Sequence, residues 1–167
     1  MKLTLGALIA VTALAGWAQT GPCAEIMLSA QPEPPIRISQ KPISATSDEN
    51  FYVHVIFSNT MTGDHVVNVK LTTPGGFLYQ QVDVPITLNT VRGPATRSVP
   101  GYPRPLTVVQ VDQNRSPRPN TGVISIAIPL AGTTITQNAL FGKWSVDVDL
   151  DFEPKTCTGA VVFEIEP

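Results

Sequence analysis

The chain has 167 residues and a formal net charge of −2 at pH 7, from 11 Lys and Arg residues against 13 Asp and Glu residues. This length suits one domain with its own core, and the mildly acidic balance excludes the basic footprint that nucleic-acid binding requires. The 16 prolines and the frequent Val, Ile and Thr residues favour strands and turns over helices.

Residues 1–18 have the pattern of an export signal. Lys2 precedes an apolar stretch over residues 3–14, and small residues follow it, which is the order expected of a signal-peptidase substrate. The apolar stretch is shorter than the roughly 20 residues that cross a bilayer as a helix. We therefore expect cleavage after Ala18, with Ala15 as the alternative, and a secreted or periplasmic protein with no transmembrane segment.

Two cysteines remain after that cut, Cys23 and Cys157. An even number in an exported chain favours a disulfide, and two cysteines so far apart lack the spacing of metal ligands. A lipid anchor on Cys23 would need a small residue where Pro22 stands. We therefore predict a Cys23–Cys157 disulfide that ties the N-terminal segment to the turn before the last strand.

The mature chain divides into a Pro-rich lead-in over residues 19–43 and a domain over residues 44–167. Alternating apolar and polar residues predict short strands, most clearly where Trp144 and the following inward positions alternate with Asp and Ser residues. We expect residues 131–140 to form a loop with one helical turn. The predicted strands are 36–39 (a short edge strand in the lead-in), 51–58, 66–72, 77–86, 106–111, 122–130, 143–152 and 159–166.

This succession of short strands and turns, without a long helix, predicts an all-β fold, namely an antiparallel β-sandwich. Residues 141–149, then Cys157 and residues 161–165, resemble the closing hairpin of bacterial exported immunoglobulin-like domains. In that hairpin a Gly-x-Trp-x-Val-x-Val strand precedes a turn and a final strand with a Phe-x-Ile-like pattern. The resemblance implies an immunoglobulin-like sandwich of about seven to nine strands and implies no activity.

Two irregular segments, residues 89–105 and 112–121, carry five arginines and a tyrosine in a Pro-Gly-Tyr-Pro sequence. If these segments meet at one end of the sandwich, the guanidinium groups form a rim that suits a carboxylate, a phosphate or a sulfated glycan. The simpler interpretation is that loops carry polar residues. The candidate ligand-binding residues are Arg92, Arg97, Tyr102, Arg104, Arg115 and Arg118.

Asp147, Asp149 and Asp151 are expected on one face of one strand, about 7 Å apart. A Ca²⁺ ion could use these oxygens only with further ligands from elsewhere. The alternative is an exposed sheet face whose charges keep it soluble and block edge pairing.

A second metal hypothesis concerns His54, Met61 and His65, which lie close together in sequence. Exported copper proteins use His and Met ligands, but an isolated histidine is more often structural.

No catalytic motif is present, because the sequence has neither Gly-x-Ser-x-Gly nor His-Glu-x-x-His. We expect a non-enzymatic binding or structural protein without a cofactor, whose partner is another envelope or extracellular protein or a glycan. A periplasmic protein that binds copper or calcium is one alternative, and a small secreted enzyme is the other.

Overall fold

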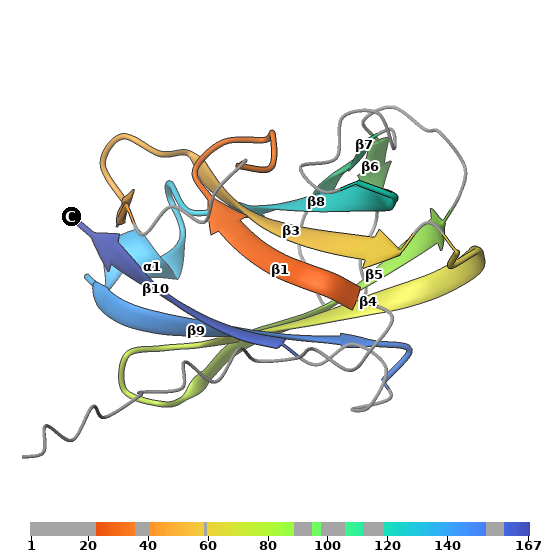
Figure 1. Ribbon diagram of the computed structural model, residues 1–167. Helices are drawn as coiled ribbons and strands as arrows, with labels where there is room; N and C mark the ends of the chain where they lie inside the picture. The colour runs from red at the N-terminus through yellow and green to blue at the C-terminus, as the bar shows by residue number, and fades with distance from the viewer. Residues whose placement is uncertain are drawn as a thin grey trace, which may run out of the picture.

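The computed structural model contains ten strands and one short helix within the residues that it describes. Its strands form two five-stranded sheets that face each other as two layers (Figure 1). The all-β prediction is therefore confirmed. The described residues are 23–35, 41–58, 60–88, 95–97, 106–111, 119–152 and 159–167.

Sheet A is antiparallel throughout, and sheet B is antiparallel except where β2 pairs with β10. The strands of sheet A, in spatial order, are β1 (Cys23–Ser29), β3 (Asn50–Ser58), β8 (Thr121–Pro129), β7 (Leu106–Val111) and β6 (Ala95–Arg97). Those of sheet B are β2 (Ile43–Ser44), β10 (Gly159–Glu166), β9 (Gly142–Leu150), β4 (Gly63–Thr72) and β5 (Leu78–Leu88).

One apolar core lies between the two sheets. The alternation of apolar and polar residues along the strands produces this core, because successive side chains point to opposite faces and only the apolar set faces inward. In β3 the inward residues are Phe51, Val53, Val55 and Phe57, and in β9 they are Trp144, Val146, Val148 and Leu150, all buried.

The structure contains more strands than the seven to nine expected. Of the additional strands, β1 comes from the Pro-rich segment 19–43, β2 spans the end of that segment, and β6 comes from the irregular segment 89–105. β1 lacks alternation because both of its faces are buried: Ile26 and Leu28 join the core, whereas Met27 packs with Ile56 on the other face of sheet A. The predicted edge strand 36–39 lies outside the described residues.

The predicted helical turn within residues 131–140 is present as α1 (Thr134–Gln137). The Thr133 hydroxyl caps it by accepting a hydrogen bond from Ile135 N, and the Ile135 side chain is buried in the core. Across the described residues, no helix has the length and apolar character needed to cross a membrane.

Candidate functional site

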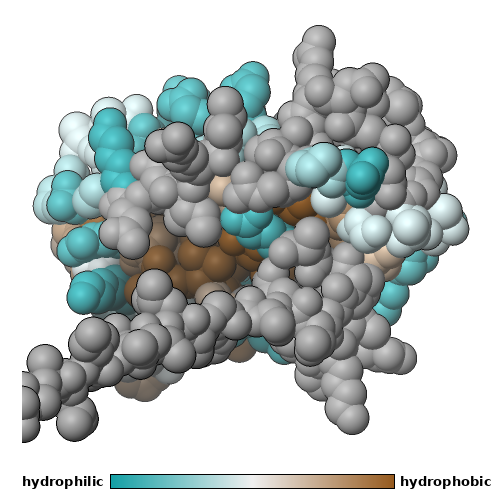
Figure 2. Space-filling model, in the orientation of Figure 1, coloured by the Kyte–Doolittle hydropathy of each residue, from teal (hydrophilic) through white to brown (hydrophobic). Residues whose placement is uncertain are grey.

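A groove of about 520 Å³ with an apolar floor and a partly polar lining lies between β1 and β10, the strands that face each other across one side of the two layers. Figure 2 shows hydrophobic atoms gathered between the layers on this side. The apolar floor consists of Ile26, Leu28, Ile43, Val161 and Phe163, with Lys143 and Glu164 among the polar lining residues.

The groove exists because two strand edges face each other without a strand between them. β1 is the terminal strand of sheet A, and β2 pairs with β10 only at Ile165 and Glu166. Within the described residues, no strand therefore lies beside positions 159–164 of β10 on the groove side. Such an edge presents backbone N–H and C=O groups that another extended chain can pair with.

The floor of the groove is continuous with the core. The Phe163 ring lies 5.2 Å from the ring of Phe51, which is fully buried, and Val161 also packs against the core. Phe163 and Val161 are themselves only partly buried. An apolar ligand in the groove would therefore cover core side chains that the described strands leave partly open.

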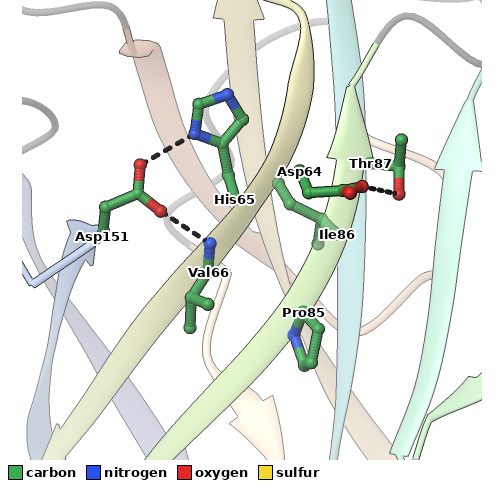
Figure 3. Close-up of a pocket in the computed structure, with 7 residues that line it drawn as sticks. All are labelled: Asp64, His65, Val66, Pro85, Ile86, Thr87 and Asp151. Carbon is green, nitrogen blue, oxygen red and sulfur yellow. Dashed lines mark hydrogen bonds and ion pairs between the residues drawn. The ribbon is translucent and has the colours of Figure 1, made fainter.

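A second, smaller cavity of about 290 Å³ lies where β4 and β5 meet the turn after β9 (Figure 3). β9 ends at Leu150, and Asp151 and Phe152 adopt left-handed backbone conformations with φ of 54° and 60°. This turn directs Asp151 toward β4, where its carboxylate accepts hydrogen bonds from Val66 N at 2.8 Å and from His65 Nδ1 at 2.8 Å.

Both ring nitrogens of His65 face hydrogen-bond acceptors. Nδ1 faces the Asp151 carboxylate and Nε2 faces the Thr62 carbonyl at 3.0 Å, so both are satisfied as donors only when the ring is protonated. The hydrogen bond to Asp151 raises the pKa of His65 above its usual 6.5. For Asp151, partial burial opposes ionisation, but the bonds from His65 and Val66 outweigh it and lower the pKa of that carboxyl.

Replacing Asp151 with Asn is expected to lower the pKa of His65 toward its usual value, because the charged acceptor at Nδ1 is lost. NMR titration of the His65 ring measures this shift. Asp64→Asn is the control, since Asp64 acts on His65 only through its charge and is expected to produce a smaller decrease. An unchanged His65 pKa in the Asp151 variant would contradict this account.

The contact between His65 and Asp151 also makes the stability of the protein depend on pH. Because the pKa of His65 is raised on folding, the stabilisation from the pair is complete below the unfolded-state pKa and is lost as pH rises through the folded-state value. Both partners are solvent-accessible, so this contribution is small.

The three aspartates proposed as calcium ligands do not converge. Asp149 forms an ion pair with Lys70 of β4, with Oδ2 and Nζ 3.0 Å apart, and Asp147 lies opposite Lys70 in the strand register. Asp151 lies in the turn and contacts His65. Among the residues that the structure describes, no three His, Cys, Asp or Glu side chains form a group suited to a metal ion.

The proposed copper ligands are also separate. His54 is in sheet A and fully buried, with Nδ1 2.7 Å from Ser125 Oγ and Nε2 2.8 Å from Ser29 Oγ. Met61 is partly buried against the core, and His65 is in sheet B. Burial lowers the pKa of His54 to about 4, so its ring is neutral at pH 7.

Most of the residues proposed for the arginine rim lie outside the part of the chain that the structure describes. The backbone of Arg97 is in β6, but its side chain is outside the described part. Also outside it are Arg92, Tyr102, Arg104, Arg115 and Arg118.

The predicted disulfide also lies outside the described part of the chain, because neither Cys157 nor the side chain of Cys23 is described. The strands that flank these cysteines are described. β1 begins at Cys23, β10 begins at Gly159, and both strands start at the same end of the molecule (Figure 1). The disulfide stays a prediction.

Comparison with known proteins shows no matching family model, no matching curated protein and no matching solved structure.

The sequence does not predict the groove. One wall of the groove is β1, which lies in the segment expected to be a Pro-rich lead-in. The sequence signal for this strand is the short apolar run of residues 26–28 between prolines. A short apolar run bounded by turn residues is typical of a strand buried on both faces. No local pattern indicated that β1 and β10 would lie side by side.

Proposed function

We propose that this chain is an exported, non-enzymatic binding protein of the immunoglobulin-like sandwich class. Its groove between β1 and β10 would hold a segment of another envelope or extracellular protein. The single observation that carries this proposal is a groove whose apolar floor is continuous with the core and which is bordered by two strand edges. The proposed export rests on the N-terminal sequence pattern.

The lining of the groove suits a protein ligand. Its floor is aliphatic and aromatic, which suits apolar side chains, and its lining also includes the charged side chains of Lys41, Lys143 and Glu164. This combination suits a protein segment that carries both apolar and polar residues. The two His side chains hold neighbouring protein groups with both ring nitrogens. Neither histidine therefore offers an open nitrogen to a metal or a substrate.

The immunoglobulin-like class is supported by the closing hairpin. β9 and β10 pair in antiparallel register, with Trp144 opposite Phe163, and both side chains face the core. This matches the Trp strand and the Phe-x-Ile strand of the resemblance, with Ile165 as the buried final residue.

Filling the groove is expected to abolish ligand binding without unfolding the protein. Val161→Phe adds a ring at a partly buried position on the groove floor. The probe is a set of random peptides of about ten residues, long enough for one strand, selected on the wild-type chain and measured by fluorescence anisotropy.

Leu78→Phe is the matched control, since Leu78 is 61% exposed on β5, at the opposite end of sheet B from β2 and β10. It is expected to bind the selected peptides as the wild type does. Failure to select any peptide, or equal binding by the Val161 variant at an unchanged melting temperature, would refute the groove as the binding site.

A further inference from the structure

We infer that the ligand of the groove is an extended polypeptide that adds to sheet B as a strand, hydrogen-bonded to the outer edge of β10. This inference rests on the proposed function and adds the conformation and chemical class of the ligand. It is carried by the backbone of β10 and by the short strand β2.

β2 shows how this edge accepts a chain. Ala45 N donates to Glu166 O at 2.8 Å, so the backbone groups of Glu166 point away from β9 and toward the side on which β2 lies. The N–H and C=O groups of one residue in a strand point to the same side, and this side alternates along the strand. The register of β10 with β9 has no bulge.

Alternation from Glu166 places the backbone groups of Val162 and Ala160 on the same outer side, toward the groove. β2 covers only Ile165 and Glu166 of this edge, so within the described part of the chain no strand pairs with β10 at these two residues. A ligand strand here would continue the row that β2 begins. Its hydrogen bonds to the backbone give affinity, and its alternate side chains meet the apolar floor, as in β-strand addition.

The side chains around the groove fit this geometry. Val161 and Phe163 point inward from β10, Ile26 and Leu28 point inward from β1, and Val162 points outward with 66% of its surface exposed. The expected ligand has apolar residues at every second position, which face the floor, with polar residues between them.

Val162→Pro directly tests the hydrogen bonds between the ligand and the edge of β10. Val162→Pro removes one N–H on the groove side and leaves the β9 ladder intact, and proline is tolerated at such an edge position. We expect the affinity for the selected peptides to fall about tenfold or more, because a hydrogen bond is lost and the ring obstructs the edge. Val162→Thr keeps the N–H and the shape, so it should bind the selected peptides more tightly than Val162→Pro does.

N-methylation of the peptide tests the same bonds without altering the protein. Methyl groups placed one at a time along a selected peptide should weaken binding at alternate positions, where the amide faces β10, and spare the positions between them. Uniform sensitivity along the peptide, or no sensitivity, would overturn the inference. So would wild-type affinity in a folded Val162→Pro variant.

The remaining outcomes separate the two proposals. If Val161→Phe abolishes binding while Val162→Pro and the methylated peptides bind normally, the groove is a binding site but the ligand is not a paired strand. If the wild type forms a concentration-dependent dimer that Val162→Pro dissolves, the occupant is a second copy and the inference is wrong. If Val162→Pro lowers the melting temperature sharply and the wild type selects no peptide, a segment of the chain itself fills the edge, and both proposals fail.

Discussion

Replacing Trp144 with alanine is expected to destabilise the protein by about 4 kcal/mol, the range found when a large buried aromatic residue is removed. Trp144 is 1% exposed and packs edge-on against Tyr79, with ring centroids 5.2 Å apart. Its indole Nε1 also donates to the Leu140 carbonyl at 2.8 Å. The alanine variant therefore loses apolar contacts, leaves a cavity and removes the partner of that carbonyl.

Thermal unfolding measures this loss, and a chain of this size should melt about 10 °C lower. Trp144→Phe keeps most of the apolar volume and should lose only about 1–2 kcal/mol, mainly from the hydrogen bond. Phe77→Ala is the exposed control, because Phe77 is 74% exposed, and it should change stability by less than about 0.5 kcal/mol. If Trp144→Ala melted at the temperature of Phe77→Ala, Trp144 would not belong to the core as described.

Acidification is expected to destabilise the protein through His54. Burial lowers the pKa of its ring from 6.5 to about 4, while the contact with the Gln31 backbone opposes this shift in part. The Ser29 hydroxyl donates to Gln31 O at 2.8 Å, so Ser29 Oγ accepts from His54 Nε2–H and the Ser125 hydroxyl donates to Nδ1. Protonation of Nδ1 would force the Ser125 hydroxyl hydrogen away.

The sign of this effect follows from the lowered pKa. The unfolded chain protonates His54 below about pH 6.5, whereas the folded chain protonates it only near pH 4. The stabilisation from the neutral ring is therefore fully present above pH 6.5 and is lost as the pH falls toward 4. A shift of this size corresponds to about 3 kcal/mol. Denaturant unfolding at neutral pH and at the lower value measures the difference.

The control is His54→Gln, whose amide can bond to both serines but does not titrate in this range. Between neutral pH and pH 4, the unfolding free energy of the variant should fall by less than that of the wild type, because the variant has no His54 to protonate. Equal acid sensitivity of the two proteins would show that His54 is not buried as a neutral ring.

Strands with one buried face could be recognised from the sequence. In β9, Trp144 and Val146 alternate with polar residues, and the predicted strand agrees with the observed one to within two residues at each end. The alternation ends at Leu150 because Asp151 turns back toward β4, and a left-handed residue other than glycine has no strong sequence signal. The sequence does not predict β1, because a strand buried on both faces does not alternate.

The amino-acid sequence by itself determined the secondary-structure class and the core positions of the alternating strands, since period-two burial is a local property that each of these strands carries in its own residues. Only the tertiary structure decided the sites. The contact between His65 and Asp151 joins residues 86 positions apart, and the groove depends on β1 and β10, from opposite ends of the chain, becoming neighbouring edges of two sheets. These positions are set by sheet order and strand register, which arise from pairing between distant segments and leave no mark on any single segment.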